Sequence, residues 1–211
     1  MWIKICGMTT RAGVEAAIAA GVDAIGFVFA PSKRRVTALA ASHLAHGVTG
    51  KVLRVAVMQH PSQALVDEVL AQFKPDVLQT DYEDLPNLQL PSELSVLPVL
   101  RAGRVIADLP KRILFEGPVS GTGEKADWNR AAALAKQTQL ILAGGLNAAN
   151  VADAIAKVQP FGVDVSSGVE CTTGVKDAEK IVEFVSRVRN ANSPLPNPPP
   201  RRGRGAGTRN S

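Results

Sequence analysis

The chain has 211 residues, of which 45% are apolar, 20% charged and 4% aromatic. This composition is typical of a globular protein with a sizeable core, and no apolar run reaches the roughly 20 residues that a membrane span requires. The first residues lack a basic stretch followed by a long apolar one, so we expect no signal peptide. The two cysteines, Cys6 and Cys171, have neither disulfide-framework nor metal-ligand spacing, which favours a cytoplasmic protein without a metal site.

The net charge of +5 raises the question of a polyanionic partner. Residues 190–211 hold four arginines and no acidic residue, so the rest of the chain is close to neutral and we expect no nucleic-acid partner. The same segment is rich in proline and cannot bury enough apolar surface to offset the entropy of ordering. We therefore expect a catalytic domain over residues 1–189 and a disordered tail over residues 190–211. A weak contact of this tail with an anionic partner is the alternative to its having no role.

Eight short apolar runs, the expected strands, alternate with segments of helical periodicity. In chain order the pattern predicts strand 3–6, helix 10–20, strands 22–29 and 52–58, helix 61–73, strands 77–79, 96–100 and 112–115, helix 129–136, strand 140–143, helix 149–157, strand 162–165 and helix 177–188. Continuous apolar strands between helices are typical of a parallel sheet covered on both faces.

Eight such strands predict an α/β fold, a (β/α)8 or TIM barrel. The chain is short for this fold, which typically needs about 250 residues. Residues 101–111 leave room for only a stub of helix, so we expect an abbreviated fifth βα unit. The alternative architecture is an open, doubly wound sheet.

In a barrel, the site residues follow the C-terminal ends of the strands. Cys6 ends the first run and Gly7 follows it, so the thiol is either a reactive group at the strand tip or a small buried apolar residue. Lys4 precedes Cys6 by two positions and therefore lies on the same face of the strand. We hypothesise that its ammonium group favours the thiolate.

Glycine-rich turns follow the last two strands, at residues 143–147 and 164–170. Glycine lets the backbone approach an anion, and the N–H groups at a helix N-terminus attract it. Either glycine-rich segment alone would indicate only a tight turn. Together they predict a phosphate site at the place where barrel enzymes bind phosphate.

Two further segments follow strand ends. The basic residues 33–35 are either a carboxylate site, which an arginine fork suits, or an exposed charged loop. The glycine-rich segment 116–127 is long enough to be a mobile lid, and it ends in Asp127 just before a helix. Asp127 is either a functional acid or only a helix N-cap.

Taken together, these motifs resemble the phosphoribosylanthranilate isomerase family of tryptophan biosynthesis, from residue 3 to about residue 189. The motifs are KICGMT at 4–9, GFVF at 26–29, GTG at 121–123, DW at 127–128, AGGLN at 143–147 and VDVSSGVE at 163–170. The resemblance implies a (β/α)8 barrel that converts N-(5-phosphoribosyl)anthranilate to 1-(2-carboxyphenylamino)-1-deoxyribulose 5-phosphate by an Amadori rearrangement. It implies no cofactor, a small phosphosugar substrate, and a monomer or homodimer.

The resemblance also implies roles for residues. Cys6 matches the family's general base and Asp127 its general acid, while Arg34 matches the arginine that binds the anthranilate carboxylate. Because Arg35 is adjacent to Arg34, the resemblance does not decide which of these two arginines binds the carboxylate. The residues that match the phosphate cradle are Gly144, Gly145, Ser166, Ser167 and Gly168.

Two strand ends depart from the family pattern. After the fourth strand the family usually reads Gln-Leu-His-Gly, where this chain has residues 79–82, QTDY. After the sixth strand Glu116 replaces the usual aspartate. We expect these departures to affect the rate of the reaction more than the identity of the enzyme. The alternatives are another phosphosugar isomerase barrel and a catalytically impaired phosphate-binding barrel.

Overall fold

The computed structural model describes residues 1–48, 50–101, 103–104, 106, 108–117 and 126–191. Eight parallel strands form a closed barrel in chain order, and β8 pairs with β1. They are β1 (Trp2–Cys6), β2 (Ala24–Val28), β3 (Leu53–Val57), β4 (Val77–Asp81), β5 (Ser95–Arg101), β6 (Arg112–Glu116), β7 (Gln139–Leu142) and β8 (Gly162–Val165). The (β/α)8 prediction is therefore confirmed, and the open sheet is excluded.

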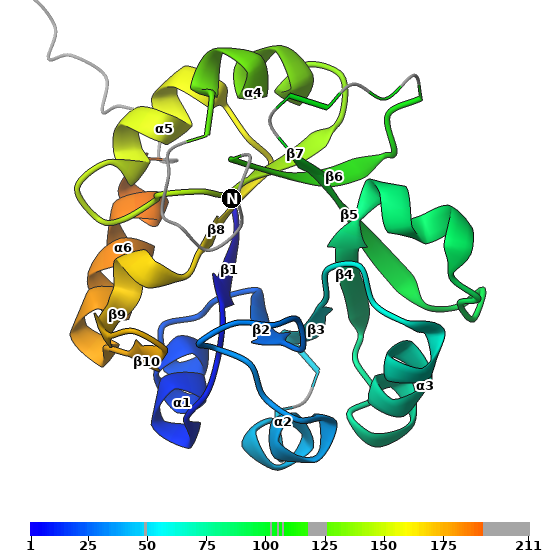
Figure 1. Cartoon of the computed structure of the whole chain (residues 1–211). Coiled ribbons are helices and arrows are strands. Elements are labelled where there is room, and N and C mark those ends of the chain that lie inside the picture. Colours follow the sequence, from blue (N-terminus) through cyan, green and yellow to red (C-terminus); the bar gives the residue numbers. More distant parts are fainter. Residues whose placement is uncertain (49, 102, 105, 107, 118–125, 192–211) are drawn as a thin grey trace, which may run out of the picture.

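Helices surround the barrel, as Figure 1 shows. They are α1 (Arg11–Ala19), α2 (Ala38–Leu44), α3 (Gln63–Gln72), α4 (Trp128–Ala135), α5 (Val151–Val158) and α6 (Ala178–Ala191). Sequence periodicity did not predict α2, whose seven residues are too few for a clear repeat. Its start is fixed by Thr37, whose side chain accepts a hydrogen bond from the Ala40 amide.

The short chain is accommodated between β4 and β6. A 3-10 helix, η1 (Tyr82–Asn87), stands in place of an α-helix after β4. The described residues between β5 and β6 form no helix, so the fifth unit is abbreviated as predicted. Fewer outer helices let a barrel form in fewer residues than usual.

The apolar side chains form two layers because residues alternate along each strand. Those that face outward, such as Ile3, Ile5 and Phe27, pack beneath the helices in the larger core. Those that face inward, such as Leu97, Val99 and Leu114, fill the barrel interior. Inward-facing polar residues continue this interior layer toward the C-terminal mouth, where they are available for chemistry.

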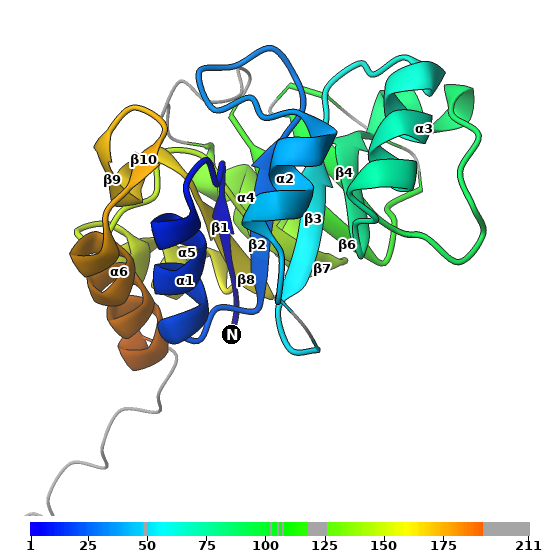
Figure 2. The same cartoon turned by 90° about the horizontal axis from the view of Figure 1, so that it is seen from below.

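A short extension follows β8 and lies beside α1 and α6 at the mouth end of the barrel. It consists of the 3-10 helix η2 (Ser167–Val169) and the hairpin of β9 (Glu170–Thr172) and β10 (Val175–Lys176), none of which the sequence patterns predicted. In Figure 2 this hairpin lies at the end of the barrel opposite the N-terminus. It brings the buried side chains of Glu170 and Lys176 to the mouth.

The last described element is α6, which buries Ile181, Phe184 and Val188. It ends at Ala191, two residues beyond the predicted domain boundary. The predicted tail from residue 192 onward lies outside the described residues, as does most of the predicted lid, residues 118–125. None of the helices in the described part is long and apolar enough to cross a bilayer.

Candidate active site

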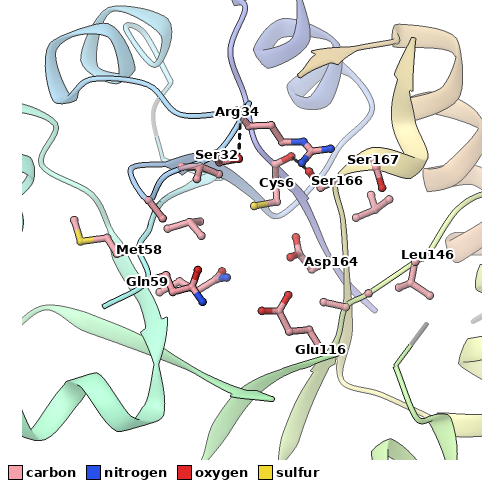
Figure 3. A pocket seen from close by; sticks show the side chains of 18 of the residues that line it. Cys6, Ser32, Arg34, Met58, Gln59, Glu116, Leu146, Asp164, Ser166 and Ser167 are labelled. Carbon is pink, nitrogen blue, oxygen red and sulfur yellow. Dashed lines mark hydrogen bonds between the residues drawn. The ribbon is translucent and has the colours of Figure 1, made fainter. Parts of the chain in front are cut away.

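One pocket at the C-terminal mouth collects most of the predicted site residues (Figure 3). Its lining includes Cys6, Arg34, Gly144, Gly145, Ser166 and Ser167. These residues come from β1 and from the loops after β2, β7 and β8. The barrel closure therefore brings together residues as distant in the sequence as Cys6 and Ser166, which are 160 positions apart.

Cys6 is buried, with 8% of its surface exposed. Burial raises the pKa of its thiol, while the nearby Lys4 ammonium acts in the opposite direction without cancelling the rise. Lys4 itself is fully buried and donates to Asp164 over 2.9 Å. Burial disfavours the charge on Lys4, but the interactions with Asp164 and Cys6 together outweigh it and raise the pKa of Lys4, so this ammonium stays charged at neutral pH.

Gly26 makes room for this pair of side chains. A Cβ atom at Gly26 would lie 3.1 Å from the Cys6 sulfur and 3.1 Å from Lys4 Cε. The glycine on β2 thus allows the thiol and the ammonium group to approach each other inside the barrel.

Arg34 lies in the pocket wall, whereas Arg35 is exposed. The Arg34 guanidinium donates to both oxygens of Glu170, over 2.7 and 2.9 Å. Lys176 donates to the same carboxylate over 2.8 Å. Burial opposes the charge on Glu170, but the hydrogen bonds from Arg34 and Lys176 prevail and lower the pKa of this carboxyl to about 2. The orientation of Arg34 is therefore fixed by a charged partner that the sequence patterns did not identify.

The two glycine-rich turns meet beside Cys6. Gly144 and Gly145 have φ angles of 91° and 65°, which require glycine. At Gly168 a Cβ atom would lie 2.0 Å from the Leu146 carbonyl oxygen, so only glycine lets the two turns approach this closely. Ser166 donates to the Cys6 carbonyl oxygen over 3.0 Å and so attaches the second turn to β1.

Asp127 occupies a different position from the other predicted residues. It is exposed and caps α4, because its Oδ1 accepts hydrogen bonds from the amides of Asn129 and Arg130 at 2.9 and 3.2 Å. Asp127 is not one of the described residues that line the pocket. The structure shows its capping role directly.

The sequence patterns did not identify several polar residues at the mouth as site residues. They are Gln79, Asp81, Arg101 and Glu116. They occupy alternate, inward-facing positions at the ends of β4, β5 and β6. Gln79 and Glu116 line the same pocket as Cys6. Gln79 Oε1 is buried and has no hydrogen-bond partner in the part of the chain that the structure describes. The period of two along each strand was the signal that would have found these residues.

His60, Asp81 and Asp84 form the one His/carboxylate group in the described residues whose ligand atoms lie within 4.8 Å of one another. His60 Nδ1 lies 2.8 Å from Asp84, and this hydrogen bond raises the pKa of the imidazole. The ion pairs among these residues account for their proximity without a metal. His43 and His46 are exposed.

Comparison with known proteins agrees with this geometry. Residues 3–187 match the family model described as N-(5′-phosphoribosyl)anthranilate (PRA) isomerase. An N-(5′-phosphoribosyl)anthranilate isomerase of Streptococcus pneumoniae is 40% identical over 195 residues, which is 89% of this chain and 96% of that protein.

Solved structures give the same result. The phosphoribosyl anthranilate isomerase of Thermus thermophilus is 29% identical with a TM-score of 0.78, over 90% of this chain and 99% of that one. TrpF from Jonesia denitrificans is 34% identical with a TM-score of 0.73, over 90% and 98%. A further isomerase, at 26% identity and a TM-score of 0.71 over 90% and 99%, was solved with reduced 1-(o-carboxyphenylamino)-1-deoxyribulose 5-phosphate. On the match over nearly the whole barrel, the chain belongs to the N-(5′-phosphoribosyl)anthranilate isomerase family.

Proposed function

We propose that this pocket catalyses the Amadori rearrangement of N-(5′-phosphoribosyl)anthranilate, the isomerase step of tryptophan biosynthesis. One observation carries the proposal: a chain of this family gathers a thiol, an arginine and two glycine-rich turns in one pocket. The small-molecule substrate has a phosphate, a sugar and an aromatic carboxylate, and the pocket offers a group suited to each end.

The two ends of the substrate would bind to different groups of the pocket. The phosphate would bind at the turns after β7 and β8, through Gly144, Gly145, Ser166, Ser167 and Gly168, because their backbone can approach an anion closely. The carboxylate would bind to Arg34, whose planar fork suits an oxygen pair. Glu170 keeps the arginine in place.

The chemistry needs one acid and one base. Asp127 would give a proton to the furanose ring oxygen, which opens the ring to a Schiff base. The Cys6 thiolate would then remove the C2′ proton, giving an enolamine that tautomerises to the ketone. Both cap bonds of Asp127 end on Oδ1, and proton transfer from Asp127 needs only Oδ2.

The test follows turnover by the loss of substrate fluorescence in the wild type and in Cys6→Ser and Asp127→Asn. We expect each variant to lose most of its turnover, about 10²–10⁴-fold for a general acid or base. Both should still bind the reduced product analogue, since neither residue holds its phosphate or carboxylate.

Cys171→Ser provides the matched control, because Cys171 is the other free thiol and is exposed. Its turnover should equal that of the wild type. A wild-type protein that does not exceed the uncatalysed rate would end the proposal.

The setting of the enzyme belongs to the same proposal. We infer a cytoplasmic protein that acts as a monomer or a homodimer. The similar isomerase from Thermotoga maritima is described as dimeric. Light scattering on the purified protein decides between the two states.

A further inference from the structure

Three charged side chains at the ends of neighbouring strands form one network. Arg101 on β5 contacts Glu116 on β6 through Nη1 at 2.6 Å and Asp81 on β4 through Nη2 at 2.7 Å. All three are largely buried, with exposed side-chain fractions of 15% for Arg101 and Glu116 and 7% for Asp81. One guanidinium therefore holds two carboxylates at the barrel mouth. These carboxylates stand at the two strand ends that depart from the family pattern.

The network follows from the alternation of residues along the strands. Leu97 and Val99 face the barrel interior, so Arg101 occupies the next inward position of β5. Leu114 also faces inward, which makes Glu116 the next inward position of β6. Arg101 and Glu116 are direct register partners across these two strands.

Glu116 belongs to the pocket as well as to the network. It lines the cavity that contains Cys6, and Figure 3 shows its carboxylate pointing into that cavity. The other carboxylate of the pocket, Asp164, is bonded to Lys4 below the mouth. Glu116 therefore presents an acceptor to whatever occupies the space above the barrel.

We propose that Glu116 accepts hydrogen bonds from the hydroxyl groups of the sugar part of the substrate, and that Arg101, anchored by Asp81, is the residue that positions it. This inference rests on the proposed function. An ionised carboxylate only accepts hydrogen bonds, and sugar hydroxyls donate them. β6 neighbours β7 in the barrel, and Glu116 lines the same pocket as Gly144 and Gly145, so a sugar whose phosphate sits at these turns lies within reach of the end of β6.

The identity of residue 101 matters for the positioning role. The planar fork of an arginine contacts two carboxylates from two different nitrogens, as it does here, whereas a lysine is a single point charge. The ion pair with Asp81 draws the guanidinium toward the end of β4. A lysine at this position would preserve charge but not the orientation of Glu116.

The test measures kcat and KM separately for Glu116→Gln, Arg101→Gln and the double variant. Loss of a charge-assisted hydrogen bond made equally in the ground state and the transition state raises KM by roughly tenfold and leaves kcat close to the wild type. Arg101→Gln should raise KM in the same way. The double variant should be no worse than Glu116→Gln, because Arg101 acts through Glu116. Arg101→Lys should recover only part of the loss.

Arg54→Gln provides the matched control. Arg54 forms a two-bond ion pair with Asp76, at 3.0 and 3.0 Å, at the opposite end of the barrel. Removing this ion pair should leave KM unchanged, whatever it does to the melting temperature. A rise in KM in this control would assign the effect of Arg101 to general stability and overturn the inference.

Binding separates failure of this inference from failure of the proposed function. If the proposed function is wrong, the wild type neither turns over nor binds reduced 1-(o-carboxyphenylamino)-1-deoxyribulose 5-phosphate. If only the inference is wrong, the wild type turns the substrate over and binds the analogue, but the variants do not behave as expected. Either Glu116→Gln then keeps the wild-type KM, or the increases in KM of Glu116→Gln and Arg101→Gln multiply in the double variant. If both hold, Glu116→Gln weakens binding of the analogue about as much as it raises KM. Its affinity for inorganic phosphate should then stay unchanged.

Discussion

At the scale of single residues, the reactivity of Cys6 is a balance between burial and the charged groups around the thiol, among which Lys4 has the largest effect. Burial raises the pKa of the thiol, and Lys4 partly offsets that rise. The strand period of two correctly predicted that Lys4 and Cys6 share a face. It did not reveal Asp164, because this partner of Lys4 lies 160 residues away and becomes its neighbour only through the β1–β8 pairing.

Lys4→Met should therefore move the pH dependence of turnover. Without the ammonium group the pKa of Cys6 rises further, so the thiolate forms only at higher pH. The acidic limb of the kcat/KM profile should shift upward in pH, and activity at pH 7 should fall. A profile identical to that of the wild type would contradict the role assigned to Lys4.

This experiment needs a partner variant, since Lys4→Met leaves the buried Asp164 unpaired at a cost of about 3–5 kcal/mol. The double variant Lys4→Met/Asp164→Asn removes both charges and should recover stability in thermal unfolding.

At the scale of elements, the site depends on how closely two turns approach. The sequence showed that both turns after β7 and β8 are rich in glycine. It did not show why each glycine is needed. Gly144 and Gly145 are needed for their positive φ angles, whereas Gly168 is needed because the opposite turn leaves no room for a side chain. The second reason is a tertiary contact, which local patterns do not contain.

Gly168→Ala should weaken phosphate binding. Its Cβ atom would lie 2.0 Å from the Leu146 carbonyl oxygen, so the two turns must separate. Overpacking of this kind costs about 1–3 kcal/mol of stability. We expect a lower melting temperature and a weaker affinity for inorganic phosphate, measured by calorimetry.

Gly21→Ala is the control for Gly168→Ala. Gly21 has a φ of 75° but nothing within 4 Å of its added Cβ, and it lies far from the pocket lining. It should lose stability through backbone strain and keep the wild-type phosphate affinity. Equal losses of phosphate affinity in both variants would show that the turns do not act through their close approach.

At the scale of the whole molecule, the alternation of apolar strands and helices was enough to predict the barrel. The elements it missed, namely α2, the two 3-10 helices η1 and η2 and the β9–β10 hairpin, are too short to establish a period. The cluster around Arg34 was missed for another reason. Glu170 is 136 residues away from Arg34, and only closure of the barrel brings them together. Sequence motifs therefore identified the residues that line the pocket, but not the residues that hold the lining residues in position.

Closure of the barrel also depends on its last helix. The buried face of α6 supplies Ile181, Phe184 and Val188, and α6 packs against α1 and α5. Arg189 donates to the carbonyl oxygens of Met1 and Gly21 over 2.9 Å each. The end of α6 is thus fastened to the start of the chain.

Two truncations should consequently differ sharply. A chain ending at Ala191 loses only the proline- and arginine-rich residues 192–211, which have no apolar periodicity, so kcat/KM and the melting temperature should match those of the full chain. A chain ending at Asp177 loses the buried face of α6, at about 1.5–3 kcal/mol for each large side chain, which is comparable to the whole stability of a domain. It should fail to unfold cooperatively in a thermal scan. A loss of turnover in the first truncation would give the tail a part in catalysis, contrary to its composition.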